Sequence, residues 1–190
     1  MPDHPDLRTG AVYGTGKREE NLRGYFAAIS AMDEQIGRLL NAVEEQGLAD
    51  NTVILFTADN GMSMGQHGVW GKGNGTFPMN MYDSAVKVPF LISWPGHIPA
   101  NTVCSEMVSA CDLLPTILKL TGLSDKQPAG LPGRSFTELL KGEQREHRDE
   151  VVIFDEYGPV RMIRTKEWKY VHRYPCLLYT SDAADDTPCV

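Results

Sequence analysis

TVILFTADNG, residues 52–61, joins a short apolar run to a polar turn. Its first six residues are apolar or β-branched, which is typical of a strand buried on both faces, as in a parallel sheet. Ligands of open α/β sheets bind beyond the carboxyl ends of the strands, and Asp59 falls at that place. The stretch therefore predicts an α/β fold with a binding loop directly after this strand.

A long amphipathic helix is predicted ahead of the strand, over residues 19–46. Apolar residues recur there at steps of three and four, the spacing of one helix face. Glu19 and Glu20 suit the positive N-terminal end of a helix dipole. Gly47 follows at the place where a helix commonly stops, so we expect the helix to end there.

Further strands are predicted on the C-terminal side. The segment at 87–94 reads as a strand in which Pro89 must lie at the start or on an edge. Antiparallel strands are expected within residues 150–174, around a turn at Gly158 and Pro159. The order of elements indicates the α/β class: part of a mixed or parallel sheet flanked by helices, with a small C-terminal antiparallel β meander.

Two helices are predicted between these strands. The first lies in CDLLPTILKLTG, residues 111–122, with Asp112 as its N-cap. The second lies in RSFTELLKG, residues 134–142, where Ser135 and Glu138 have the spacing of a capping box. Both segments end in glycine, which favours a helix stop.

Amino-acid composition disfavours several classes of protein. The chain has 190 residues, 42% of them hydrophobic, and a formal charge of −7, which disfavours a general nucleic-acid-binding surface. No apolar run is long enough to span a bilayer, and the first residues lack a signal-peptide pattern. The compartment is left open, with the periplasm and the cell exterior among the options. The four cysteines form no C-x-x-C pair, so neither a disulfide framework nor a zinc site is expected.

The loop FTADNGMSMGQHGVWGKG, residues 56–73, begins with two candidate metal ligands. Asp59 offers a carboxylate and Asn60 a neutral carbonyl oxygen, both hard ligands suited to Ca²⁺ or Mg²⁺. Gly61 would let the chain turn sharply just after them. Two ligands do not complete a site, so others must come from elsewhere.

The same loop carries groups for an anion. Lys72 lies between two glycines, where a ligand can approach its ammonium group closely. His67 could donate a hydrogen bond to the same anion or to a leaving group, or act as an acid. A cation and a lysine facing one pocket indicate a tetrahedral dianion such as sulfate or phosphate.

Each of these residues also has a structural interpretation. Asp-Asn-Gly is a common turn, a single GKG is a weak motif, and a single histidine is more often a hydrogen-bonded surface residue. Trp70 either lines a substrate pocket or packs beneath the loop, with equal support. Asn74 either binds a sugar or serves a turn.

A longer series of motifs resembles the sulfatase family of the alkaline phosphatase superfamily. The series consists of ADNG...GQHGVWGKG, MYDSAVKVPFLISWPGHIP, VSACDLLPTILKLTG and LPGRSFTELLKG. As an ordered series it is specific, although each motif alone is not. By this resemblance, residues 1–150 are the C-terminal portion of a sulfatase catalytic α/β domain and residues 151–175 a small antiparallel subdomain. Residues 176–190 resemble the translation of a sequencing adapter and are interpreted as a non-native tail, the alternative being a genuine disordered C-terminus.

The resemblance implies a sulfuric ester hydrolase, arylsulfatase-like, that acts on a sulfated small molecule or carbohydrate. It implies one divalent cation, usually calcium, and places Asp59 and Asn60 on the metal. It places Lys72 on the sulfate group and His67 at a recurrent position of the loop, with Trp70 and Asn74 as candidate substrate contacts. Family members use a formylglycine made from Cys or Ser in a C/S-x-P-x-R motif, and its hydrated form attacks sulfur.

That nucleophile motif is absent from these 190 residues. We therefore expect a C-terminal fragment of a metal-dependent sulfatase that does not turn over alone. Two alternatives stay open. One is a phosphodiesterase or phosphonate hydrolase on the same scaffold, and the other is a non-catalytic relative that binds an anion or sugar.

Overall fold

The computed structural model describes residues 8–9, 18–76, 78–143, 146–155 and 160–174. The chain divides into two compact units. Unit 1 consists of residues 1–92, 153–162 and 171–190, and unit 2 of residues 93–152 and 163–170. The division into a catalytic portion at 1–150 and a subdomain at 151–175 remains a prediction.

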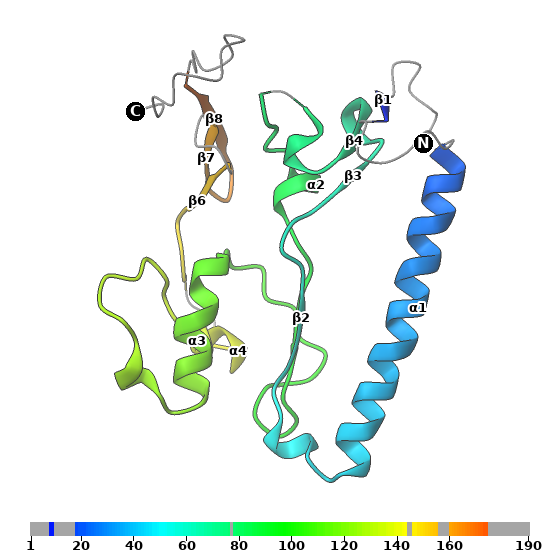
Figure 1. Cartoon of the computed structure of the whole chain (residues 1–190). Helices are drawn as coiled ribbons and strands as arrows, with labels where there is room; N and C mark the ends of the chain where they lie inside the picture. The colour runs from blue at the N-terminus through cyan, green and yellow to red at the C-terminus, as the bar shows by residue number, and fades with distance from the viewer. Residues whose placement is uncertain (1–7, 10–17, 77, 144–145, 156–159, 175–190) are drawn as a thin grey trace, which may run out of the picture. The chain divides into compact units, whose positions relative to one another are not determined.

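Unit 1 begins with the long helix that the sequence predicts, α1, Arg18–Glu45 (Figure 1). Glu19 and Glu20 lie in its first turn, where a carboxylate interacts favourably with the helix dipole. The helix stops at Gly47, which has a positive φ of 66° and donates its N–H to the Glu44 carbonyl at 2.9 Å. The predicted helix and its glycine stop are both confirmed.

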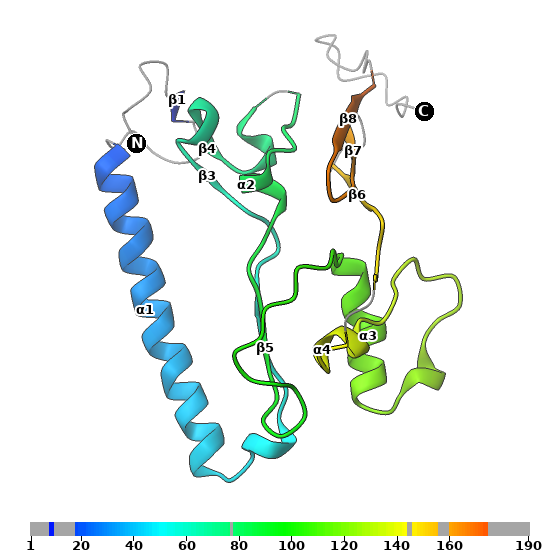
Figure 2. The same cartoon turned by 180° about the vertical axis from the view of Figure 1, so that it is seen from behind.

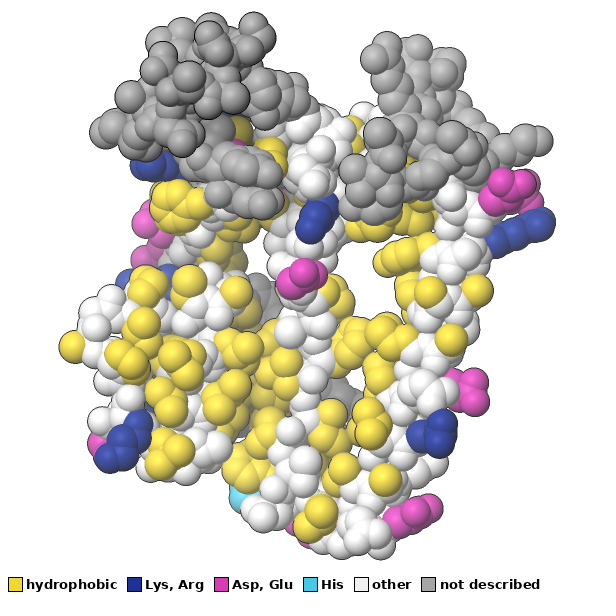
Figure 3. Space-filling model, in the orientation of Figure 1, with side chains coloured by type: hydrophobic (Ala, Val, Ile, Leu, Met, Phe, Trp, Pro, Cys, Tyr) yellow, Lys and Arg dark blue, Asp and Glu magenta, His cyan; other side chains and the backbone are white. Residues whose placement is uncertain are grey.

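The apolar face of α1 lies open. Phe26 is 60% exposed and Leu39 is 68% exposed. In Figure 3, hydrophobic side chains follow one side of this helix and charged side chains follow the other. The periodicity that predicts the helix therefore matches a face that the described residues leave largely uncovered.

Short strands follow α1 in unit 1. They are β2, Ile54–Thr57; β3, Ser63–Met64; β4, Val69–Gly71; and β5, Phe90–Ser93. A two-residue strand β1, Arg8–Thr9, pairs with β4 in parallel, and β3 pairs with β4 antiparallel. This sheet is mixed, as predicted.

The strands β2 and β5 form a second pair, and they run side by side in both views (Figures 1 and 2). Pro89 immediately precedes β5, which confirms its expected place at the strand start. All four residues of β2 are half-buried. The expectation that this strand is buried on both faces is therefore wrong for the described chain, because each of its four residues stays partly exposed to solvent.

A methionine-rich cluster forms the core of unit 1. Met81, Val160 and Met162 are each at most 6% exposed. Partly buried residues packed against them are Met79, Val86, Ile153 and Val171. Flexible thioether side chains fill such irregular spaces well. The cluster thus packs the segment before the short helix α2, Asp83–Val86, against the C-terminal strands.

The C-terminal meander is present. Its strands are β6, Val151–Phe154; β7, Val160–Arg164; and β8, Lys169–Arg173, in the order β6-β7-β8. The turn between β7 and β8 is closed by a hydrogen bond from Thr165 N to the Trp168 carbonyl at 2.8 Å. The predicted turn at Gly158 and Pro159 and the tail at 176–190 lie outside the described residues.

Unit 2 contains the two predicted helices, α3, Leu113–Leu120, and α4, Thr137–Leu140. Asp112 occupies the N-cap position of α3, as predicted, but its side chain makes no capping hydrogen bond there. Its carboxylate instead accepts from the N–H of Ser109 at 2.9 Å, across the short 3-10 helix η4, Ala110–Asp112. Ser109 and Asp112 thus form a capping box at the start of η4.

The capping box predicted at α4 is wrong. The Ser135 hydroxyl accepts from the nearby Thr137 N–H at 3.3 Å, and Glu138 pairs with Lys119 instead of reaching back to the helix start. None of the described helices is both long enough and apolar enough to cross a bilayer.

Candidate functional site

The loop after β2 presents Asp59 and Asn60 at the carboxyl end of that strand. Asp59 is exposed, and its Oδ1 accepts a hydrogen bond from Asn60 N at 2.7 Å. Asn60 is half-buried, and its Nδ2 donates to the Gly61 carbonyl at 2.9 Å. These local bonds form the turn that places two oxygen-bearing side chains next to each other at the end of a strand.

Gly61 is required for a different reason than a sharp turn. Its N–H donates to the Ala85 carbonyl at 2.9 Å, which draws the loop against α2. A Cβ at this position would lie 2.1 Å from the Ser84 carbonyl oxygen and 2.9 Å from that of Lys87. Gly61 is not among the glycines with positive φ. The glycine therefore allows close backbone approach, and the sharp-turn interpretation is corrected.

The side chain of Lys72, near the end of the loop, contacts Asn60 near the start of the loop. Its Nζ donates to Asn60 Oδ1 at 3.3 Å, although twelve residues separate the two in sequence. Both side chains are half-buried. The structure thus brings together the amide and the ammonium group that the sequence analysis singled out, and Asp59 directly precedes that asparagine in the chain.

His67 has a different neighbour. It is exposed and has a positive φ of 57°, which is uncommon for a residue other than glycine. Its ring stacks on that of Tyr82, with 4.1 Å between the ring centroids and 15° between the planes. The hydrogen bond that joins Asn60 to Lys72 does not include His67.

The two candidate substrate contacts differ in burial. Trp70 lies in β4 and is only 3% exposed, which favours the interpretation that it packs beneath the loop. Asn74 is exposed in the 3-10 helix η3, Gly73–Gly75, two residues after Lys72. Of the two, Asn74 is the side chain that a bound molecule could reach in this chain.

The side-chain oxygens of the loop are suitable ligands for a hard cation, but they are too few to complete a site. Asp59 and Asn60 supply oxygen atoms, the ligands that Ca²⁺ and Mg²⁺ prefer. Calcium takes about six to eight such ligands. Among the residues that the structure describes, no group of three or more His, Cys, Asp and Glu side chains could hold a metal ion. A complete calcium site would therefore need further oxygen ligands besides Asp59 and Asn60.

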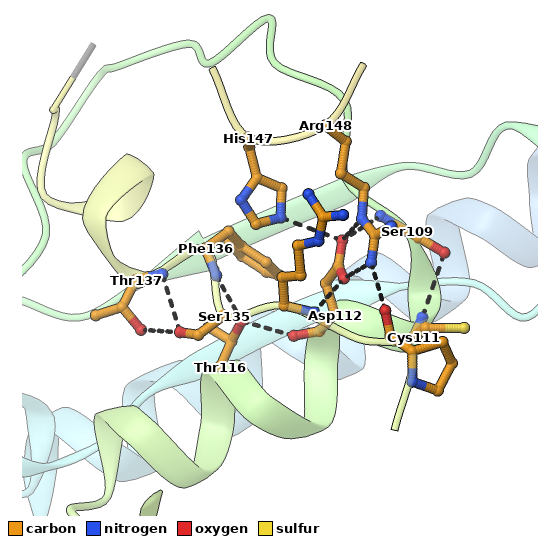
Figure 4. Close-up of polar contacts among 11 residues, drawn as sticks. Ser109, Cys111, Asp112, Thr116, Ser135, Phe136, Thr137, His147 and Arg148 are labelled. Atoms are coloured by element: carbon orange, nitrogen blue, oxygen red, sulfur yellow. Dashed lines mark hydrogen bonds and ion pairs between the residues drawn. The ribbon is translucent and has the colours of Figure 1, made fainter. Parts of the chain in front are cut away.

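The sequence analysis treats Asp112 only as a helix cap, whereas the structure shows that it is a buried carboxylate in unit 2. Asp112 is fully buried and accepts hydrogen bonds from Arg148 Nε at 2.7 Å and from Arg134 N at 2.7 Å. It also contacts a second nitrogen of Arg148 and His147 Nε2, the latter at 3.3 Å (Figure 4). Both carboxylate oxygens are thus occupied by groups of the chain itself.

The pKa of Asp112 follows from these contacts. Burial on its own raises the pKa, but the hydrogen bonds from Arg148 and from the Arg134 and Ser109 N–H groups outweigh burial and lower it. A shifted pKa often marks a functional site, yet structural ion pairs produce the same shift. With its oxygens engaged, Asp112 serves to join η4 to residues 147–148. No local pattern could reveal a partner 36 residues away.

Two family models match the chain. The model described as Sulfatase matches residues 3–123, and the model described as N-sulphoglucosamine sulphohydrolase, C-terminal, matches residues 65–183. Both matched ranges contain the loop segment from residue 65 to Lys72.

Individual relatives are similar over most of the chain. N-acetylglucosamine-6-O-sulfatase from Bacteroides thetaiotaomicron is 31% identical over 183 residues, which cover 89% of this chain and 30% of that protein. Human Arylsulfatase A is 33% identical over 187 residues, 93% of this chain and 36% of that protein. The solved structure of a 2-O GAG sulfatase aligns with a TM-score of 0.64 and 29% identity, covering 90% of this chain and 37% of that one. The chain spans about a third of the length of the relatives it matches.

Proposed function

Because the chain belongs to the sulfatase family, we propose that its Asp59–Lys72 loop forms part of the active site of a sulfuric ester hydrolase. The observation that carries this proposal is the 3.3 Å hydrogen bond from Lys72 Nζ to Asn60 Oδ1. It joins the two kinds of group that a hydrolase of a sulfate ester needs, an oxygen ligand for a cation and a positive charge for the anion.

Asp59 and Asn60 are the residues of this chain that would hold one divalent cation, calcium in this proposal. A bound cation would help to neutralise the negative charge that develops on the ester oxygens. The chain's own contribution is to hold the two ligands adjacent. The Asn60 N–H bond to Asp59 Oδ1 and the Asn60 side-chain bond to the Gly61 carbonyl do this.

Lys72 would contact the sulfate group. An ammonium group has three N–H donors, so its bond to Asn60 leaves two for sulfate oxygens. The half-buried position of the side chain strengthens its interaction with the anionic sulfate group relative to one in bulk water. His67 would act as a hydrogen-bond donor or acid at the leaving group, and Asn74 would contact the substrate.

The substrate in this proposal is a sulfated carbohydrate or small molecule. Similar proteins support both kinds of substrate, since they include an N-acetylglucosamine-6-O-sulfatase and a Choline-sulfatase. The nucleophile is expected to be a formylglycine from a C/S-x-P-x-R motif, which is absent from these 190 residues. The chain alone is therefore proposed to be inactive.

The test uses a longer polypeptide that carries this sequence together with such a motif. Asp59→Ala is expected to abolish calcium-dependent hydrolysis of an aryl sulfate and to lower calcium affinity. Asp125→Ala is the matched control, because Asp125 is an exposed aspartate whose side chain pairs with its neighbour Lys126. Unchanged calcium affinity in Asp59→Ala would refute the metal assignment.

Lys72→Ala is expected to lower kcat/KM for the aryl sulfate on the order of a hundredfold, the usual effect of losing an oxyanion partner. Lys87→Ala is the control, because Lys87 is an exposed lysine that pairs with Asp83 at 3.0 Å. An aryl phosphate is assayed in parallel. A larger kcat/KM for the phosphate than for the sulfate would overturn the sulfatase assignment in favour of a phosphoryl-transfer enzyme.

A further inference from the structure

We propose that Asn80 is a positioning residue that holds Lys72 in place for the anion. This inference rests on the proposed contact between Lys72 and sulfate. Asn80 is only 3% exposed, so it cannot itself bind a sugar from solution in this chain. Its Nδ2 donates to the Lys72 carbonyl at 3.2 Å and to the Gly73 carbonyl at 3.0 Å. The Asn80 side chain is therefore hydrogen-bonded to the main chain at Lys72.

The buried amide of Asn80 uses both of its donors and its acceptor. Its Oδ1 accepts from Tyr82 N at 3.3 Å, and its main-chain N–H donates to the Gly73 carbonyl at 3.0 Å. An amide is suited to this place because it offers two N–H donors and one carbonyl acceptor at once. Buried polar groups that lose such partners are costly, so the contacts make the backbone at Lys72 rigid. A rigid backbone limits the directions in which the lysine side chain can reach.

The residues that follow Asn80 contact the other parts of the loop. The ring of Tyr82 stacks on His67, and the Ala85 carbonyl accepts from Gly61 N at 2.9 Å. Asn80 therefore begins a segment, residues 80–85, that contacts the candidate metal turn, the histidine and the lysine. Fixed spacing between such groups is what binding of a small tetrahedral anion requires.

Asn80→Asp is the sharpest variant, because it keeps the shape of the side chain and removes both N–H donors. A carboxylate facing two carbonyl oxygens repels them, whereas a protonated carboxyl regains one donor. At neutral pH we expect this variant to lose the hydrogen bond between Lys72 and Asn60. The bond should re-form in part as the pH is lowered and the introduced carboxyl takes up a proton. Asn80→Ala is the second variant and should show no such pH-dependent recovery.

The measurement uses the 190-residue chain with ¹³C- and ¹⁵N-labelled lysine, which leaves all three N–H donors of each ammonium group in place. An NMR cross-peak between the Lys72 ε-methylene group and the Asn60 side chain reports the contact that the structure shows at 3.3 Å. A titration with inorganic sulfate reports anion affinity at the same lysine. In Asn80→Asp at neutral pH the cross-peak should disappear and sulfate affinity should fall at least about tenfold. Asn51→Ala is the control, since Asn51 is an exposed asparagine in the 3-10 helix η1, Ala49–Asn51.

Each outcome decides the proposal. A cross-peak that persists in both Asn80 variants overturns it. Loss of the cross-peak together with the core signals of Val160 and Met162 also overturns it, because Asn80 would then support the whole unit and not the lysine. Loss of the cross-peak with the core signals intact supports it. Unchanged sulfate affinity in Lys72→Ala would instead refute the proposed function, and the cross-peak would still decide the role of Asn80.

Discussion

Gly61→Ala should destabilise the chain because the added methyl group has no room. The new Cβ would lie 2.1 Å from the Ser84 carbonyl oxygen, and real Cβ atoms essentially never approach closer than 3.0 Å. The loop must therefore move by about 0.9 Å, the difference between these two distances. The obstacle is backbone, which cannot rotate away as a flexible side chain can.

The energetic cost has two parts. Forcing extra volume into a packed contact costs about 1–3 kcal/mol. Displacing the loop also weakens the 2.9 Å hydrogen bond from Gly61 N to the Ala85 carbonyl, which contributes about 1 kcal/mol. The free energy of unfolding should therefore fall by about 2–4 kcal/mol, a large fraction of the stability of an ordinary domain.

Urea unfolding followed by circular dichroism measures this change. Gly24→Ala is the matched control, because Gly24 lies inside α1 and nothing comes within 4 Å of the Cβ that would be added. Alanine in a helix interior should raise stability by about 0.5–1 kcal/mol over glycine. The two glycine-to-alanine changes should thus have opposite signs. If Gly61→Ala proves as stable as the unaltered chain, the close approach of the loop to α2 is refuted.

Three further predictions concern unit 2. Asp112→Ala should lower the free energy of unfolding by about 3–5 kcal/mol, because the largely buried Arg148 guanidinium loses its carboxylate partner. Urea unfolding measures this change, and a loss below about 1 kcal/mol would contradict the prediction. Although burial opposes the shift, hydrogen bonds led by that from Arg148 lower the pKa of Asp112 in the folded chain. The carboxylate therefore stabilises the fold above the ordinary aspartate value of 3.8, and this stabilisation is lost as the pH falls below it. Urea midpoints between pH 6 and pH 3 should fall more steeply for the unaltered chain than for Asp112→Asn, and parallel curves would argue against it. Glu138→Ala should cost less than about 1 kcal/mol, since its partner Lys119 is exposed, and a larger loss of thermal stability would show that this pair is stronger than surface pairs usually are.

Local patterns in the sequence were enough to predict most of the elements. The apolar periodicity of residues 19–46 and the glycine at 47 predict α1 and its end, because both signals lie within the helix itself. The strand before Asp59 and the strand after Pro89 are found in the same way. The types of side chain at Asp59, Asn60 and Lys72 also indicate the chemistry, since hard oxygens and an ammonium group have few roles in common other than holding a cation and an anion.

Long-range contacts decided what local patterns could not. Ser135 and Glu138 have capping-box spacing, but Glu138 pairs with Lys119 from another helix, and spacing carries no information about such a competitor. Asp112 similarly resembles a helix cap, yet Arg148, 36 residues later, converts it into a buried ion pair. Only folding of the loop brings Lys72 to Asn60, twelve residues away. Asn80 donates to the Lys72 and Gly73 carbonyls and Gly61 donates to the Ala85 carbonyl, and local sequence spacing carries no information about such contacts.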